Sequence, residues 1–436
     1  MTTKSNASDL WIPNTKILSK PMHKLRTIKK PQRHFNVHPQ LPRVNVNFTA
    51  SLISAGAFML LSIWLLIWRL DTQTAGLVSS RELTTLQNLN RFSPWWQTPS
   101  YLYGPYYLLL RLFNLIGHNL TILRLTSVIC GGLVVAGIYW LINELHGWRI
   151  AFLATAILIT NYGFLTITRL VSPQISQLLA VTAIALVIYI INTWDNYWTL
   201  LVFSAVVALV IYIPGGIWLG LTAIGLSFTD LKDSLKETAL KLQILLYGLF
   251  IILVAPLVYR LVYSYTNHQM LTWLGYGLNG RLSALKELGL NFVRTPLDLF
   301  AYESKLPADL AIKHLPILSL AASVIVIIGL LSYISRLTNP KWRLITILLG
   351  VMWLLSSLGV VSVYALLPLL SVAAATGLTF LLKQWYEVFP RNPFARYFGL
   401  FLMAIVVAFS CFFAARTYFV VWANDPVVNA NYTQRL

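Results

Sequence analysis

Cysteine is almost absent from this chain of 436 residues, and the usual signs of a metal or redox protein are absent with it. The two cysteines, Cys130 and Cys411, lie inside long apolar stretches, so they say nothing about disulfides or redox compartment. The sequence also lacks a cluster of residues with metal-ligand spacing, a glycine-rich phosphate loop and a Ser/His/Asp arrangement. These absences argue against a metal centre, a P-loop nucleotide enzyme and a triad hydrolase.

Acidic residues are also scarce. The chain has 14 Asp and Glu against 33 Lys and Arg, which gives a net charge of +19. The apolar stretches contain almost no acids, so a proton relay through carboxylates is not expected. Nine of the bases fall in residues 1–45, beside a single acid, Asp9. We expect this Pro- and Asn-rich tail to be disordered and cytoplasmic. We expect its charge to contact anionic membrane lipids, at ~1 kcal/mol per base, and not nucleic acid.

Hydrophobic sequence, in contrast, is abundant: 57% of the residues are hydrophobic and the mean hydropathy is +0.68. A hydrocarbon core of ~30 Å needs about 20 apolar residues per spanning helix. The apolar runs are continuous rather than alternating, so they predict membrane helices and not strands. The fold class is therefore an all-α, polytopic membrane protein with about 11 transmembrane helices. The expected spans are 49–69, 121–142, 150–168, 174–194, 197–213, 215–228, 242–264, 316–335, 343–361, 363–382 and 397–421.

The fifth and sixth of these stretches are separated only by Ile213-Pro214-Gly215-Gly216, so they could form a tight hairpin or one broken helix. Basic segments flanking membrane helices remain cytoplasmic, which places the N-terminus inside. With two separate helices, the later basic segments around Lys236, Arg343 and Lys383 also fall inside; with one helix they all fall outside. The sequence therefore favours the hairpin. It predicts a multi-pass protein of the plasma membrane with an extracytoplasmic C-terminus and a transmembrane domain over 46–436.

Two outer segments, about 70–120 and 264–316, are too long to be simple connections and are expected to be structured. In the first, residues 80–89 have a capping Ser and leucines three residues apart, which predicts a helix. Residues 101–116 are aromatic and leucine-rich, with Pro105 suited to a first turn, and predict a second helix lying in the membrane interface. In the other segment, the spacing of Leu282, Leu285 and Leu288 predicts a short amphipathic helix.

Several motifs occur in a particular order along residues 70–195. An acid, Glu82, follows the first span, and an aromatic and leucine-rich segment follows from Pro99. The second span opens with Leu123-Arg124-Leu125-Thr126-Ser127, and the third ends in Leu165-Thr166-Ile167-Thr168-Arg169 with Pro173 behind it. Much later comes Tyr364-Ala365-Leu366-Leu367-Pro368-Leu369. This order resembles the protein-mannosyltransferase-like GT-C glycosyltransferases, the group of the protein O-mannosyltransferases and lipid A aminoarabinose transferases. One acid stands where that family usually has two, and Gln174 stands where it often has Asp.

The resemblance implies an extracytoplasmic, inverting transfer of sugar from a polyprenyl-phosphate donor to an acceptor hydroxyl. A carboxylate would act as general base, and cations would hold the departing lipid phosphate. It implies Glu82 as the base, with Asp71 as the second candidate. It implies substrate-binding roles for Arg81, Arg124, Arg169 and Tyr364. No cofactor is assigned; a divalent metal is compatible with the family but has no supporting ligand set in the sequence.

Each of these residues also has a structural interpretation. Glu82 would favour a helix N-terminus and contribute ~0.3–1 kcal/mol, so its replacement by Gln would hardly change folding. Arg81 would be its ion-pair partner, and Arg124 and Arg169 would extend toward the membrane interface. The missing second acid leaves open a divergent or inactive member of the family. A lipid or solute transporter, or a non-catalytic membrane scaffold, is the alternative. The sequence does not identify the sugar, the acceptor or the oligomeric state.

Overall fold

The computed structural model describes residues 48–70, 77–90, 102–194, 196–263, 282–301, 310, 312, 315–335, 339–390 and 392–434. Residues 46–436 form one compact unit, separate from residues 1–45. The expected disorder of the tail and the position of Asp71 lie outside the described residues, so both remain predictions. Everything below concerns the compact unit.

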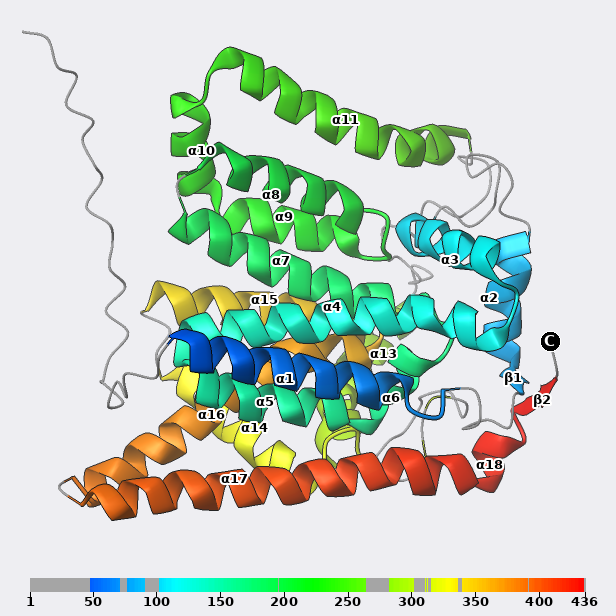
Figure 1. Cartoon of the computed structure of the whole chain (residues 1–436). Helices are drawn as coiled ribbons and strands as arrows, with labels where there is room; N and C mark the ends of the chain where they lie inside the picture. The colour runs from blue at the N-terminus through cyan, green and yellow to red at the C-terminus, as the bar shows by residue number, and fades with distance from the viewer. Residues whose placement is uncertain are drawn as a thin grey trace, which may run out of the picture. The chain divides into compact units, whose positions relative to one another are not determined.

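Each predicted apolar stretch contains a helix or a pair of helices, which confirms the all-α membrane fold (Figure 1). Five helices are long and apolar enough to cross a membrane, or six if one bent pair counts as a span. Further apolar helices in the described residues are shorter, so the number eleven remains a prediction. The helices of the predicted spans are α1 (Phe48–Ile67), α4 (Leu120–His146), α5 (Trp148–Thr160) with α6 (Tyr162–Arg169), α7 (Ile175–Thr193), α8 (Tyr197–Val210), α9 (Gly216–Leu226), α11 (Leu240–Tyr263), α14 (Leu320–Ile334), α15 (Pro340–Ser357), the 3-10 turn η1 (Val363–Leu366) with α16 (Leu367–Val388), and α17 (Pro393–Arg416) with the π-helical η2 (Thr417–Trp422).

The third predicted span is not one straight helix, because α5 and α6 are bent by 64° at Asn161. The Asn161 side chain accepts a hydrogen bond from the backbone N–H of Phe164 and so caps the N-terminus of α6. Its amide also donates to the carbonyl of Ile317 at 2.7 Å. A capping residue in mid-span therefore starts a second helix in a new direction.

The region of Pro214 forms a hairpin, as the charge distribution predicted. The helix α9 runs back beside α8 (Figure 1). Gly215 adopts a positive φ of 73°, a conformation that glycine reaches without steric cost. A Cβ on Gly216 would lie 1.9 Å from the carbonyl oxygen of Val210. The two glycines therefore make this tight turn sterically feasible.

The bundle is built around α16, most of whose residues are buried. The helices α11 and α17, in contrast, expose most of their residues. At the crossing of α14 and α16, a Cβ on Gly329 would lie 1.9 Å from the carbonyl oxygen of Ala373, so the two backbones are in close contact. Peripheral helices expose large apolar side chains, among them Ile252 and Phe409. An exposed apolar surface of this extent suits contact with lipid.

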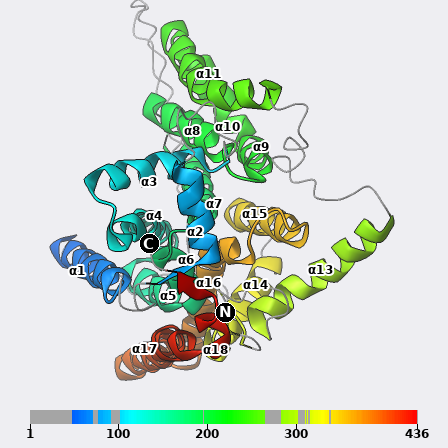
Figure 2. The same ribbon diagram turned by 90° about the vertical axis from the view of Figure 1, so that its right-hand side faces the viewer.

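The two ends of the bundle differ in character. At one end lie α10 (Phe228–Glu237), the start of α15 and the connection from α16 to α17, which carry the basic segments of the sequence (Figure 1). At the opposite end lie α2 (Ser80–Asn90), α3 (Gly104–Ile116) and α18 (Pro426–Asn429), as Figures 1 and 2 show. Two short strands there, β1 (Val78–Ser79) and β2 (Tyr432–Gln434), pair antiparallel. The C-terminal segment thus contacts the first outer segment.

The helices predicted in the outer segments are present. Pro105 lies in the first turn of α3, as predicted. The short helix expected from Leu282 to Leu288 is longer: α13 spans Leu282–Phe300 and packs against α15 (Figure 2). Pro296 lies inside this helix and does not end it.

Candidate active site

The helix α2 presents two different faces. Arg81, Thr84, Thr85 and Asn88 follow the spacing of one helical face and line a cavity. Glu82, Leu86 and Leu89 follow the same spacing on another face and are buried in the protein. One helix of 11 residues therefore serves both a cavity and the core.

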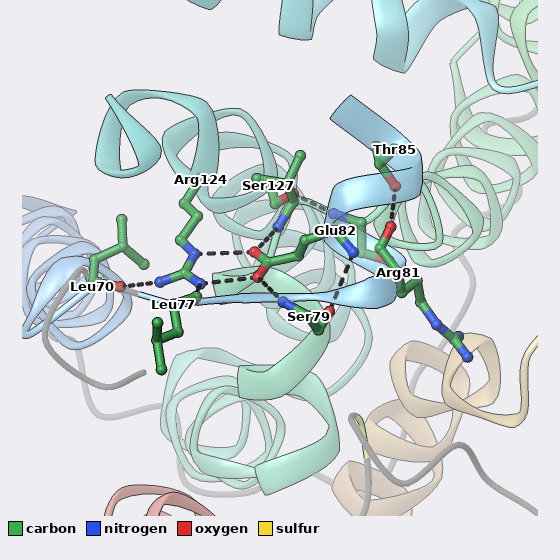
Figure 3. Close-up of polar contacts among 10 residues, drawn as sticks. Leu70, Leu77, Ser79, Arg81, Glu82, Thr85, Arg124 and Ser127 are labelled. Carbon is green, nitrogen blue, oxygen red and sulfur yellow. Dashed lines mark hydrogen bonds and ion pairs between the residues drawn. The ribbon is translucent and has the colours of Figure 1, made fainter. Parts of the chain in front are cut away.

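On the buried face, Glu82 forms an ion pair with Arg124 of α4 (Figure 3). The Nε and Nη2 of Arg124 donate to the two carboxylate oxygens of Glu82 at 3.1 and 3.0 Å. Both residues are only 1% exposed. A two-point arginine–carboxylate contact is a strong, oriented interaction. The structural interpretation of the sequence made Arg81 the ion-pair partner of Glu82. The structure instead pairs Glu82 with Arg124.

Glu82 also caps the helix on which it lies. The Oγ of Ser79 accepts from the backbone N–H of Glu82, and a carboxylate oxygen of Glu82 accepts from the N–H of Ser79 (Figure 3). This is the reciprocal capping-box arrangement, with Ser79 as the capping residue one position before the expected Ser80. The same carboxylate accepts from the N–H of Val171 at 2.9 Å. Both oxygens of Glu82 are thus fully engaged.

Arg124 extends this network to the end of the first span. Its Nη1 donates to the carbonyl of Leu70 at 2.9 Å, and its Nη2 donates to that of Leu77 (Figure 3). The ion pair therefore joins α1, β1, α2, α4 and the segment after α6. We call Glu82, Arg124, Ser79 and the carbonyls of Leu70 and Leu77 the buried hub.

The cavity beside the hub has a volume of 430 Å³, and its lining residues come from α2, the start of α3 and the segment before α7. Among the described residues, Arg81 is the charged residue that lines it, and its side chain extends away from Glu82 (Figure 3). A cation with its fork of donors suits an anionic group such as a phosphate. The other lining residues are Ser80, Thr84, Thr85, Asn88, Tyr103, Tyr107, Ser172, Pro173 and Gln174.

Part of the cavity lining is aromatic. Tyr103 and Tyr107 enter the cavity from the start of α3. Burial raises the pKa of Tyr103 well above its usual value, against an opposing hydrogen bond from Gln177. Burial likewise raises the pKa of Tyr107, against a hydrogen bond with Asn88. Both phenols are therefore protonated at neutral pH.

Arg169 lies within the protein and does not line the described cavity. It is 1% exposed, and its guanidinium donates to the carbonyls of Leu65 and Trp68, near the C-terminus of α1. The same group lies 5.2 Å from the ring centroid of Tyr418 and 4.9 Å from that of Phe419. A cation that satisfies the last carbonyls of a helix stabilises that helix end.

Tyr364 is fully buried in η1, and its hydroxyl donates to the carbonyl of Leu310 at 3.4 Å. Of the six predicted site residues, the structure brings Arg81 to the cavity and joins Glu82 to Arg124 behind it. It places Arg169 and Tyr364 elsewhere in the core, and Asp71 lies outside the described residues. Among the described residues there is no group of His, Cys, Asp and Glu that could hold a metal ion.

Sequence reasoning did not single out Tyr103, Thr84 and Asn88 as lining residues. The spacing of Arg81, Thr84 and Asn88 on the predicted helix 80–89 was the available signal. In the sequence, Gln174 stands out only as a departure from the family pattern, and Tyr103 only as part of an aromatic segment.

No protein-family model matches the sequence, and no curated protein matches it. Solved structures do match. ArnT of Cupriavidus metallidurans, a lipid A aminoarabinose transferase, aligns with a TM-score of 0.53 at 12% identity, over 88% of this chain and 75% of that one. The structure of ArnT bound to undecaprenyl phosphate aligns with the same TM-score, identity and coverages. An oligosaccharyltransferase of Archaeoglobus fulgidus, tethered to an acceptor peptide, aligns with a TM-score of 0.50 at 14% identity, over 89% of this chain and 59% of that one.

These similarities define the class of the fold: the chain is a multi-pass helical membrane protein with the architecture of the GT-C glycosyltransferases. The expectation drawn from the order of motifs is confirmed at that level.

Proposed function

We propose that this protein transfers a sugar from a polyprenyl-phosphate donor to an acceptor on the extracytoplasmic side of the membrane. The observation that carries the proposal is a cavity with a largely polar lining, Arg81 included, on a GT-C fold. A structural neighbour, ArnT, has been solved with undecaprenyl phosphate bound. A lipid-linked donor also accounts for a site at the end of a membrane bundle.

In this proposal Arg81 contacts the donor phosphate and stabilises the charge that develops on it as the sugar leaves. The acceptor hydroxyl attacks with inversion, and a carboxylate takes its proton. Asp71 and Glu82 are the two candidates for that base. Because both oxygens of Glu82 are held by the buried hub, its geometry favours a positioning role, in which it fixes α2 and thereby Arg81.

Arg124 and Arg169 support the site in this proposal through the contacts that they make with the end of α1. Tyr364 would support the cavity indirectly, through the turn η1 in which it lies. The backbone N–H of Ser362, just before η1, donates to the side chain of Gln177, which in turn holds the cavity residue Tyr103.

A transporter or a non-catalytic scaffold remains the alternative. The bend between α5 and α6 is the feature that favours a transporter, because broken helices line the substrate sites of many transporters. Asn161 at that bend, however, donates to Ile317 and caps α6, so its polar groups are used within the fold. A polar cavity at the end of the bundle, rather than at its middle, fits an enzyme better.

The proposal is tested first by donor recognition. Purified full-length protein should bind undecaprenyl phosphate and should bind undecaprenol, which has the same chain without the phosphate, at least ~10-fold more weakly, since a charge-assisted contact is worth ~1.5–3 kcal/mol. Native mass spectrometry with both lipids in competition measures the ratio. Equal binding of the two lipids would show that the protein does not recognise the phosphate and would contradict the proposal.

We also propose that the cavity end faces the outside of the plasma membrane, with residues 1–45 in the cytoplasm. The basic segments of α10, α15 and the α16–α17 connection share the opposite end of the bundle, and basic segments remain cytoplasmic. Reporter fusions at Lys236 and Asn431 should therefore give cytoplasmic and external signals respectively. Signals on the same side of the membrane would overturn this topology.

A further inference from the structure

The segment that follows α17 lies at the end of the bundle that holds α2, and it reaches the first outer segment. It comprises η2, the short helix α18 and the strand β2, and we call these residues, 417–434, the C-terminal strap (Figure 1). Its strand pairs antiparallel with β1, with Tyr432 opposite Ser79. Ser79 is the capping residue of α2, so the strap is joined directly to the residue at which that helix begins.

Aromatic rings hold the strap against the protein. The ring of Tyr432, only 4% exposed, packs edge-on against Trp422, with the ring centroids 5.7 Å apart. Trp422 stacks in turn on Tyr418 at 5.2 Å, and the Arg169 guanidinium lies 5.2 Å from the centroid of the Tyr418 ring. A sheet of two short strands is marginally stable by itself, so these buried rings supply much of what keeps β2 beside β1.

The strap has a defined structure of its own. Asp425 caps α18 by accepting from the backbone N–H groups of Val427 and Val428, and the side chain of Val428 is buried. The π-helical geometry of η2 is rare, and such turns are frequent at functional sites. The strap can therefore serve as a fixed support for the strand with which it pairs.

The strap and the buried hub meet at β1. The Nη2 of Arg124 donates to the carbonyl of Leu77, the residue directly before this strand. Tyr432 of the strap also interacts electrostatically with Arg124. Because β1 is held both by the hub and by the strap, loosening the strap leaves the hub alone to hold the start of α2.

We propose that Tyr432 is a positioning residue for donor binding: through β2 and β1 it holds the start of α2, and so holds Arg81 at the cavity. This inference rests on the proposed function, because it takes the donor phosphate as the ligand of Arg81. Ser79 and Glu82 cap each other at the first turn of α2, and Arg81 lies in that turn. A displacement of β1 therefore displaces Arg81, whereas α16, at the centre of the bundle, is buried by other helices.

The test measures the mobility of α2 and the binding of lipid in the same full-length variants. In Tyr432→Ala, hydrogen exchange of residues 78–90 should accelerate at least ~10-fold, because the variant removes a buried aromatic side chain. Exchange in α16 should keep its wild-type rate. Binding of undecaprenyl phosphate, followed by native mass spectrometry, should weaken ~3- to 10-fold, since Arg81 loses its fixed position. The control Tyr397→Ala removes the same side chain from an exposed position on α17 and should change neither property.

A cross-link between the paired strands tests the role of position directly. Val78 and Gln434 are opposite each other in β1 and β2, and opposite residues of antiparallel strands lie ~4.5–5.5 Å apart at Cα, within the range that a disulfide spans. In the Tyr432→Ala background, the oxidised pair Val78→Cys and Gln434→Cys should restore slow exchange of α2 and wild-type lipid affinity. Reduction of the disulfide should abolish both effects.

The outcomes separate this inference from the function beneath it. If the wild type does not bind undecaprenyl phosphate, the proposed function and this inference fail together. If the wild type binds the lipid and Tyr432→Ala does not change both binding and the exchange of α2, the function stands and the positioning role is wrong. The role is also wrong if Tyr432→Ala accelerates exchange in α16 as much as in α2, or if the oxidised cross-link restores neither property, because Tyr432 would then support the whole fold.

Discussion

Arg81 and Glu82 are adjacent in the sequence but lie in two different regions of the molecule. Arg81 lines a cavity of 430 Å³, whereas Glu82 is enclosed with Arg124 in the buried hub (Figure 3). The helical period separates them, because neighbours in a helix point about 100° apart. The resemblance to a glycosyltransferase family points to both residues, but their surroundings suit them to different tasks.

The buried hub explains how this end of the bundle can hold a polar cavity. A buried ion pair with its hydrogen bonds fixes α2 against α1, α4 and β1. Polar residues on the other face of the helix can then face the cavity without holding the fold together. We therefore expect substitutions in the hub to lower stability and substitutions in the cavity to lower ligand binding.

The largest expected effect is on stability, in Glu82→Gln. The variant leaves Arg124 buried without its carboxylate, and breaking a buried ion pair costs ~3–5 kcal/mol. This replaces the expectation from sequence, under which a first-turn Glu contributed less than about 1 kcal/mol. Thermal and denaturant unfolding in detergent measure the change.

Glu387→Gln is the matched control for that measurement. Glu387 pairs with Lys383 one turn away in α16, but both side chains are well exposed. An exposed pair of this kind is worth ~0.3–0.5 kcal/mol, so the control should unfold almost as the wild type does. Equal melting of Glu82→Gln and Glu387→Gln would contradict the buried hub.

Smaller effects are expected from two arginine variants. One variant should weaken lipid binding, and the other should lower stability. Arg81→Ala should weaken the binding of undecaprenyl phosphate by ~1.5–3 kcal/mol and leave the melting temperature near that of the wild type. Arg169→Ala should lower stability by a similar ~1.5–3 kcal/mol, because it removes the donors to Leu65 and Trp68. Lipid binding by the folded fraction of Arg169→Ala should be unchanged. The reverse pattern would restore Arg169 as the phosphate ligand that the family resemblance implies.

Much of the fold follows from local sequence. Continuous apolar runs predict the helices, Pro105 marks the first turn of α3, and the distribution of Lys and Arg predicts the hairpin at Gly215. The first two features depend on composition and on neighbours a few residues away, whereas the hairpin follows from the side of the membrane to which the later basic segments are assigned. The bend at Asn161 is not predicted, because the apolar run continues on both sides of it and the contact of Asn161 with Ile317 joins distant parts of the chain.

The candidate site was harder to predict, because its contacts join distant parts of the chain. Glu82 meets Arg124 across 42 positions, and Arg169 meets Leu65 across 104. Helical spacing shows that Arg81 and Asn88 share one face of α2. The sequence of the helix does not show which of its faces meets a cavity. The sequence thus identified charged residues that matter to this end of the bundle without separating those of the hub from those of the cavity.

Sugar transfer by the purified protein is the decisive measurement of the proposed function. Purified full-length protein in liposomes is given polyprenyl-phosphate donors carrying different labelled sugars, together with a membrane extract as the source of acceptors. The account predicts transfer by the wild type and a loss of roughly 10-fold or more in Arg81→Ala, in line with the removal of one charged contact. If Glu82 is the base, the transfer rate of folded Glu82→Gln should fall by ~10²–10⁴. Transfer at the wild-type rate by Arg81→Ala, or no transfer from any donor by folded protein, would contradict the account and favour a transporter or scaffold.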